Sequence, residues 1–86
     1  SRFQSRVIDV QTNSGIADVT VVLTEIDGMH VADTTKTAAD GSFIVKVKAQ
    51  PGSKIRLHFH HPQYKPYNNY YETENPSVIK LEKDPK

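Results

Sequence analysis

Residues 54–60 read Lys-Ile-Arg-Leu-His-Phe-His, and this stretch decides the fold class. Apolar side chains occupy every second position, with charged or imidazole side chains between them. A period of two is typical of a β-strand that buries one face and exposes the other, whereas an amphipathic helix repeats about every 3.6 residues. Residues 42–48 and 19–24 follow nearly the same pattern. No stretch has a comparable helical period, so we predict an all-β protein.

Turn-forming residues separate the alternating runs. They are Asn13-Ser14-Gly15, Asp27-Gly28, Asp40-Gly41, Pro51-Gly52 and Asn75-Pro76. In the Asp-Gly pair, Asp40 can bond its own backbone two residues on, and Gly41 can take a left-handed backbone angle. The runs between the turns predict seven strands: Phe3–Val10, Val19–Glu25, Val31–Thr37, Ser42–Lys48, Lys54–His60, Tyr67–Thr73 and Ser77–Leu81. The last run could instead start a helical turn at Asn75-Pro76, but its β-branched residues Val78 and Ile79 favour a strand.

Short strands at this spacing predict a β-sandwich. At 86 residues the chain is long enough for one domain, which we place at residues 1–82, with a charged tail or linker start at 83–86. One side chain from each alternating pair should enter the core. The expected core is Phe3, Val7, Val19, Val21, Leu23, Phe43, Val45, Val47, Ile55, Leu57, Phe59, Ile79 and Leu81.

Composition excludes several classes of protein. No apolar run approaches the length of a membrane-spanning helix, so we expect no membrane insertion. The chain has no cysteine, which excludes a disulfide scaffold and cysteine-ligated zinc. A net charge of +1 gives no overall attraction to nucleic acid, and we expect no nucleic-acid partner. We also expect no cofactor and no small-molecule substrate.

Basic residues concentrate in one part of the chain. Residues 46–65 hold five lysines and arginines and no acidic residue, whereas residues 1–45 hold three bases and six acids. If the fourth and fifth strands form a hairpin, one outward face carries Lys46, Lys48, Lys54 and Arg56. Such a face could dock an acidic protein surface. The alternative is a solvated face whose lysines discourage edge-to-edge aggregation.

The segment from Tyr64 to Tyr71 holds all four tyrosines and two asparagines within eight residues. Tyrosine and asparagine are enriched in binding loops, because they combine large contact area with adaptable hydrogen bonds. We expect Tyr64 to be structural. The candidate partner-binding residues are Tyr67, Asn68, Asn69, Tyr70 and Tyr71; the alternative for Tyr67 and Tyr71 is partial burial on an alternating strand.

Three histidines fall within four positions. His58 and His60 project from the same face of one strand, a spacing that would allow both imidazoles to bind one zinc or copper ion. A third ligand is needed, and His61 points to the other face unless Pro62 bends the chain. The alternatives are an exposed polar face continuing Lys54 and Arg56, which we favour, and a pH-sensitive contact. We therefore predict no metal site.

Several motifs together resemble the carboxypeptidase regulatory-like domains, which have the transthyretin-like (prealbumin-like) fold. They are Ser5-x-Val7-x-Asp9, Gly15-Ile16-Ala17-Asp18-Val19-x-Val21, Thr35-x-Thr37-x-x-Asp40-Gly41-Ser42-Phe43-x-Val45, Pro62-Gln63-Tyr64 and Ile79-x-Leu81. Ser5 and Gln63 stand where that family often has glycine. The resemblance implies a seven-stranded antiparallel Greek-key-type β-sandwich of transthyretin-like topology, with Tyr64 as its corner aromatic.

Some relatives of that fold are enzymes, but their catalytic residues are missing here. Transthyretin-like hydrolases of the purine pathway resemble this chain at Val7-Ile8-Asp9, where a catalytic histidine precedes the motif; here that position is Arg6. Their C-terminal Tyr-Arg-Gly-Ser is also absent. Without the histidine no matching base would activate water. We therefore predict that the domain is not an enzyme.

The expected function is that of an accessory module in a larger protein, binding a protein partner such as a recruited effector or a neighbouring domain. The resemblance implies hosts such as metallocarboxypeptidases, bacterial outer-membrane receptors and type VI secretion spike proteins, hence an extracytoplasmic, cell-surface or secreted-complex location. The alternative is a structural spacer or folding support for an enzyme or surface receptor.

Overall fold

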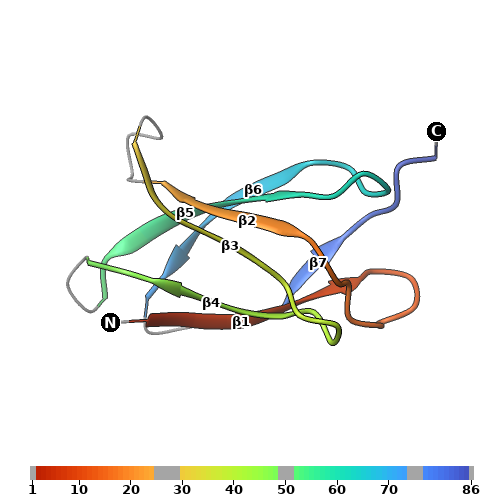
Figure 1. Ribbon diagram of the computed structural model, residues 1–86, viewed down its shortest axis with the longest axis horizontal. Coiled ribbons are helices and arrows are strands. Elements are labelled where there is room, and N and C mark those ends of the chain that lie inside the picture. Colours follow the sequence, from red (N-terminus) through yellow and green to blue (C-terminus); the bar gives the residue numbers. More distant parts are fainter. Residues whose placement is uncertain (1, 25–29, 49–51, 74–76, 86) are drawn as a thin grey trace.

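The computed structural model describes residues 2–24, 30–48, 52–73 and 77–85 (Figure 1). Within these ranges lie seven strands: β1 (Arg2–Asp9), β2 (Thr20–Thr24), β3 (Val31–Lys36), β4 (Ser42–Lys46), β5 (Lys54–His60), β6 (Tyr67–Glu72) and β7 (Ile79–Leu81). All seven predicted strands are confirmed, with ends that differ from the prediction by at most two residues. The predicted strand end at Glu25 and the turn residues Asp27-Gly28, Pro51 and Asn75-Pro76 lie outside the described residues. The same ranges contain no helix long and apolar enough to cross a membrane.

The strands form two sheets that pack face to face. One has the order β4-β1-β7 and the other the order β3-β2-β5-β6. In Figure 1 β1 and β4 make the lower layer, while β2, β3, β5 and β6 make the upper one. The two-layer β-sandwich is therefore confirmed.

One strand pair contradicts the prediction of a purely antiparallel sandwich. β7 pairs with β1 in parallel, with Val7 opposite Ile79 and Asp9 opposite Leu81. All the other pairs are antiparallel. The parallel pair arises because the chain leaves β6 in one sheet and enters β7 in the other. Such a crossover, unlike a tight hairpin, does not require the strand to run antiparallel to its new neighbour.

The fourth and fifth strands do not form the hairpin on which a shared basic face would depend. β4 pairs with β1, whereas β5 pairs with β2 and β6 in the opposite sheet. The connection between them is therefore an arch from one sheet to the other. Val47, just beyond the end of β4, is still buried. A short loop with Pro51-Gly52 suits either connection, so local turn chemistry could not distinguish them.

The core lies between the two sheets and contains all thirteen of the predicted residues. Each is less than 5% exposed, and Val7, Val19 and Leu57 are completely buried. Ile8, Ile16 and Tyr64 are additional buried apolar residues. Alternation therefore predicted the inward set well, and the additions lie at strand ends and connections, where alternation carries less information.

The Asp40-Gly41 turn forms as expected. The Asp40 carboxylate accepts hydrogen bonds from the Ser42 backbone N–H at 3.0 Å and the Ser42 hydroxyl at 2.6 Å. These bonds lower the pKa of Asp40. Gly41 has a φ of 87°, in the left-handed region that favours glycine.

The chain remains attached to the sandwich beyond Glu82. Lys83 forms a bridge with Tyr64, and the Asp84 N–H donates to the Gln63 carbonyl at 3.0 Å. The first two residues of the segment that we assign to a charged tail or linker start therefore contact the sandwich. The backbone hydrogen bonds of the segment next to Tyr64 hold them.

A buried polar pair joins β1 to the corner after β5. The Tyr64 hydroxyl donates to one Asp9 carboxylate oxygen at 2.7 Å. The other oxygen accepts from the Gln11 and Thr12 N–H groups at 2.8 and 3.2 Å. Tyr64 and Asp9 are 9% and 4% exposed. Tyr64 is therefore structural, as predicted, and it satisfies a buried carboxylate.

Because of the hydrogen bond between Tyr64 and Asp9, we expect the fold to lose stability at both low and high pH. The Tyr64 hydroxyl, followed by the Gln11 N–H, lowers the pKa of Asp9 below 3.8, so its stabilising effect is present above about pH 4 and lost as the pH falls further. Burial, followed by the bond to Asp9, raises the pKa of Tyr64 to about 12 from 10.0. Stability should therefore fall again between pH 10 and 12, because only the unfolded tyrosine ionises readily there.

Thermal unfolding of Tyr64→Phe across this pH range tests the pair. We expect a lower melting temperature near neutral pH and a shallower decline at both extremes. Tyr70→Phe, which removes an exposed hydroxyl, is the matched control and should reproduce the wild-type profile. If Tyr64→Phe also does so, the pair does not stabilise the fold.

Candidate protein-interaction site

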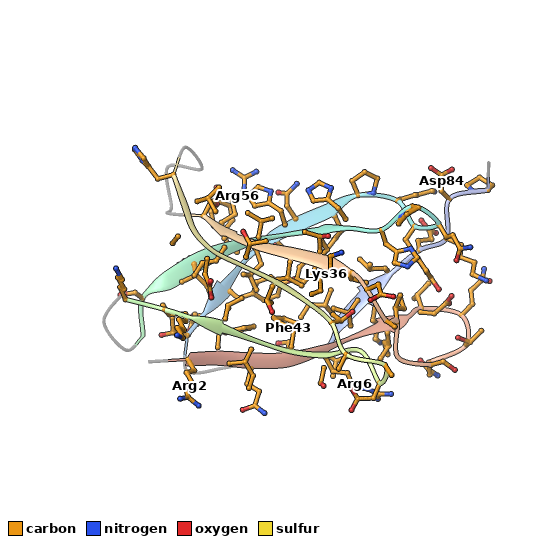
Figure 2. All side chains as sticks on the ribbon, in the orientation of Figure 1. Arg2, Arg6, Lys36, Phe43, Arg56 and Asp84 are labelled. Carbon is orange, nitrogen blue, oxygen red and sulfur yellow. The ribbon has the colours of Figure 1, made fainter. Side chains whose placement is uncertain are left out.

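The outward surface of the four-stranded sheet gathers most of the candidate residues. We call it the outer face; it comprises Thr20, Val22, Thr24, Thr34, Lys36, Lys54, Arg56, His58, His60, Asn68, Tyr70 and Glu72. Figure 2 shows Arg56 on this side of the molecule, and Arg2 and Arg6 on the opposite side. The outer face carries three lysine and arginine side chains against one carboxylate, that of Glu72. It is a positively charged surface.

Arg56 and Tyr70 form an ordered pair at the centre of β5 and β6. They lie opposite each other in the strand register. The guanidinium carbon lies 5.3 Å from the centre of the Tyr70 ring, within the range of a cation–π contact. Arg56 also donates from Nη2 to the Asn68 side-chain oxygen at 2.9 Å. Three side chains from two strands therefore hold one another in place on the surface.

This cluster keeps unused capacity for binding. Tyr70 is 48% exposed although it is a large aromatic residue. Tyrosine and arginine are the residue types most enriched at the energetic centres of protein interfaces. Because Arg56 and Tyr70 are already held in place, their own side chains would lose little conformational entropy when a partner binds.

His58 lies next to this cluster and is held in place by the neighbouring strand. Its Nε2 lies 3.1 Å from the Thr24 hydroxyl. Burial, followed by the charges of Arg56 and His60, lowers the pKa of His58 below 6.5. His58 is therefore mainly neutral near pH 7.

The histidines do not assemble a metal centre. His58 and His60 share a face, as predicted, but His61 turns away: its Nδ1 accepts the Gln63 N–H at 3.1 Å, and its ring packs edge-on against Tyr64. Among the residues that the structure describes, no group of three histidine, cysteine or acidic side chains could hold a metal ion. The third ligand that a site would need is not among them.

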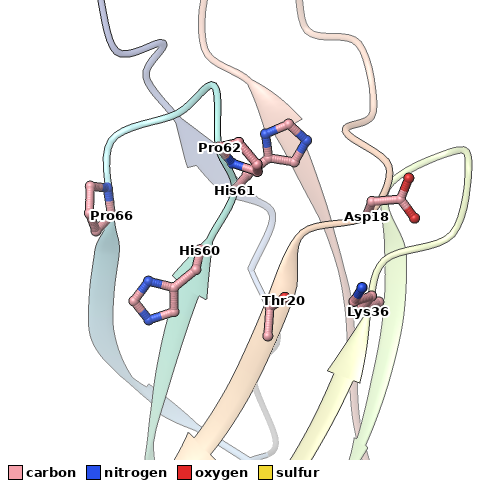
Figure 3. Close-up of a pocket in the computed structure, with 7 residues that line it drawn as sticks. All are labelled: Asp18, Thr20, Lys36, His60, His61, Pro62 and Pro66. Atoms are coloured by element: carbon pink, nitrogen blue, oxygen red, sulfur yellow. The ribbon is translucent and has the colours of Figure 1, made fainter. Parts of the chain in front are cut away.

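An open depression lies at the end of the outer face, next to His60. Its volume is about 820 Å³, and its lining residues are Asp18, Thr20, Lys36, His60, His61, Pro62 and Pro66. Figure 3 shows Thr20 between Lys36 and His60, as the strand register also requires. A hydroxyl flanked by an ammonium and an imidazole extends the polar surface beyond Arg56, and the Asp18 carboxylate in the same lining opposes the charge of Lys36.

The tyrosine-rich segment divides between two faces. Asn68 and Tyr70 lie opposite His58 and Arg56 and belong to the outer face. The alternate residues Tyr67, Asn69 and Tyr71 lie opposite Phe59, Leu57 and Ile55 on the inner side of the strand, where Tyr71 is half-buried and Tyr67 and Asn69 remain exposed. Tyr67 stacks on Phe59 with ring centres 6.2 Å apart, and Tyr71 packs against Phe3 at 5.8 Å. Of the five predicted contact residues, two are therefore presented on the outer face.

The predicted basic residues also divide. Lys54 and Arg56 lie on the outer face, but Lys46 is on β4, opposite Arg2 in the other sheet, and Lys48 follows that strand. The four do not share one face, because the hairpin that would have joined them does not form. Sequence reasoning missed Lys36 and Thr20. The alternation of the third strand could have identified Lys36, because with Thr35 and Thr37 directed inward the side chain between them must point outward.

Comparison with known proteins supports the fold. No family model matches the chain, and no curated protein matches it. Among solved structures, the Bacillus anthracis TIE protein is similar, with a TM-score of 0.68 and 17% identity. The match covers 95% of this chain and 17% of that one, so this chain corresponds to a small part of that protein. At this identity the likeness shows the fold alone.

Proposed function

We propose that this chain is a non-catalytic interaction module of a larger protein, which binds an acidic protein surface through the outer face. The observation that supports this most is the exposed, ordered cluster of Arg56, Asn68 and Tyr70 on a positively charged sheet. The partner would place a carboxylate near the guanidinium and an apolar or planar group on the tyrosine ring. The module would be of the carboxypeptidase regulatory-like, transthyretin-like type that the motifs resemble.

The test compares the partner affinity of two double variants that are matched in residue type. Tyr70→Ala with Arg56→Ala removes the cluster, whereas Ile44→Ala with Lys46→Ala removes an exposed apolar and a basic side chain from the opposite sheet. A partner captured by the wild-type domain is then titrated by calorimetry. We expect the first pair to weaken binding by about 100-fold or more, because each residue is of the type that dominates interface energies. The second pair should leave the affinity unchanged.

Binding should also weaken with added salt, since opposite charges meet at the interface. Both double variants should melt close to the wild type, because all four side chains lie on the surface. Equal loss of affinity in the two double variants, or affinity that salt does not change, would contradict the proposal. Absence of any partner would favour the alternative, a structural spacer. Deleting a spacer should destabilise the neighbouring domain, which a melting curve of the full-length protein would show.

A further inference from the structure

One flank of the sandwich is protected at both of its edge strands, whereas the other is protected at only one. At the flank of β3 and β4, the Asp33 carboxylate accepts the backbone N–H of Thr34 on one strand at 3.0 Å and that of Lys46 on the other at 2.9 Å. One side chain thus covers backbone donors of both edge strands. Natural β-proteins commonly protect sheet edges with such polar side chains.

At the opposite flank the edge of β6 is protected in the same way. The Asn69 side-chain oxygen accepts the Tyr70 N–H at 2.8 Å, and its amide donates to the Tyr67 hydroxyl at 3.1 Å. A strand that added to β6 would first have to displace Asn69. β7 is the other edge strand of this flank.

The edge of β7 is open at Lys80. The Leu81 carbonyl accepts the Val10 N–H at 3.0 Å, so the backbone groups of Leu81 point toward β1. Successive residues of a strand direct these groups to opposite sides, and those of Lys80 therefore point away from β1. Glu82 agrees with this alternation, since its carbonyl accepts the Lys65 N–H at 2.9 Å on the far side. Lys80 thus offers a backbone donor and acceptor to a further strand.

The four-stranded sheet extends over this open edge. β3 lies next to β4 at the closed flank, so the sheet with only three strands ends before it reaches β6. Tyr67 consequently remains 38% exposed although it faces inward. A strand added beside β7 would lie about 10 Å below β6, the usual separation of packed sheets. Its inward side chains would then cover Tyr67.

A hollow at this position fits an apolar side chain. It has a volume of about 300 Å³ and is lined by Val10, Lys65, Pro66, Tyr67, Lys80, Leu81 and Glu82. Val10, also on its wall, is 43% exposed. The Lys65 ammonium is already paired with the Glu82 carboxylate at 3.1 Å, whereas Lys80 has no ion pair within the described ranges. The hollow therefore combines apolar walls with one available cation.

We infer that the open flank between β6 and β7 binds an extended segment of a partner polypeptide. The segment adds as a strand along β7 through the backbone of Lys80, inserts an apolar side chain against Tyr67 and Val10, and places a carboxylate near the Lys80 ammonium. Main-chain hydrogen bonds supply affinity in this mode of recognition, and pockets for alternate side chains supply specificity. The inference does not depend on the outer face, which lies on the other side of β6.

A second copy of this chain is a poorer occupant. β7 has three residues and Lys80 is the central one. Antiparallel pairing of two β7 edges about their centres would place the two Lys80 side chains next to each other. Like charges opposite one another destabilise a strand pair. A different polypeptide with an acidic side chain at that place has no such conflict.

The test begins with a display library of short random peptides, selected on the folded domain. The recovered sequences should combine an apolar residue with an aspartate or glutamate. A recovered peptide is then added to the isotopically labelled domain, and hydrogen exchange is followed by NMR. We expect the Lys80 amide to become protected, and N-methylation of the peptide backbone to abolish that protection.

Two matched substitutions locate the site. Val10→Asp puts a second carboxylate on the wall of the hollow and should weaken peptide binding about 10-fold or more, because it opposes both the apolar and the acidic side chain of the ligand. Val31→Asp alters a residue that is 66% exposed on β3, at the opposite flank, and should have no effect. Equal effects of the two, protection at other strands, self-association through Lys80, or selection of no peptide would each overturn the inference.

Discussion

Replacing Gly41 with alanine is expected to lower the free energy of unfolding by about 4 kcal/mol or more, one of the largest effects that a single methyl group can have here. A Cβ atom at this position would lie 2.2 Å from the Val7 carbonyl oxygen and 3.0 Å from the Gly15 Cα. Both are backbone atoms, which cannot turn aside as a flexible side chain would. Gly41 also accepts the Val7 N–H at 2.8 Å, so separating the two segments would break a hydrogen bond of β1.

Gly52 supplies a matched control for this prediction. Its φ is 84°, almost the same as the 87° of Gly41, but a Cβ there would have no atom within 4 Å. Gly52→Ala should therefore cost only the left-handed conformation, about 1 to 2 kcal/mol. Urea denaturation with unchanged m-values would measure both losses. Equal losses of unfolding free energy in the two variants would show that the close approach of Gly41 to the Val7 carbonyl adds no steric cost.

The strands and the core could be predicted because alternation records burial directly. In residues 54–60 each inward position is apolar and each outward one is polar, so a single reading assigns both the strand and its two faces. On β4 the inward residues Phe43 and Val45 are likewise apolar, although the outward residue between them, Ile44, is apolar too. Such strands and their buried faces can be predicted without knowing which strands lie beside them.

The assignment of strands to sheets could not be obtained in this way. Residues 42–48 and 54–60 alternate equally well whether they form a hairpin or belong to opposite sheets. The difference lies in long-range pairing, such as Phe43 with Ser5 and Leu57 with Leu23. The parallel pair of β1 and β7 is of the same kind, because it joins the two ends of the chain.

The sequence could not assign the residues of the tyrosine-rich strand to its two faces, for a different reason. Residues 67–71 are Tyr-Asn-Asn-Tyr-Tyr, so aromatic and amide side chains occur at both odd and even positions. The alternation that identifies an inward face is absent, and the register with β5 is needed to place Tyr71 inside and Tyr70 outside. The sequence identifies this segment as a candidate site, but it does not show which side chains lie on each face of the strand.

Replacing Phe59 with alanine is the substitution expected to damage the core most, with a loss of about 3 to 5 kcal/mol. Phe59 is completely buried, and its ring lies 6.0 Å from that of Phe43, 6.2 Å from that of Tyr67 and 6.4 Å from that of Tyr71. It therefore joins β4, β5 and β6 across the two sheets. For a domain of this size such a loss is a large fraction of the total stability.

Phe59→Leu separates the loss of volume from the loss of the ring contacts. It keeps most of the apolar side chain, so its cost should be clearly smaller than that of Phe59→Ala. Tyrosine fluorescence should change in both variants, because Tyr67 and Tyr71 both pack against the lost ring. Chemical denaturation measures the stabilities, and equal losses for the leucine and alanine variants would mean that the aromatic contacts, not the filled volume, hold the sheets together. Stability close to the wild type in Phe59→Ala would contradict the central position of Phe59 in this core.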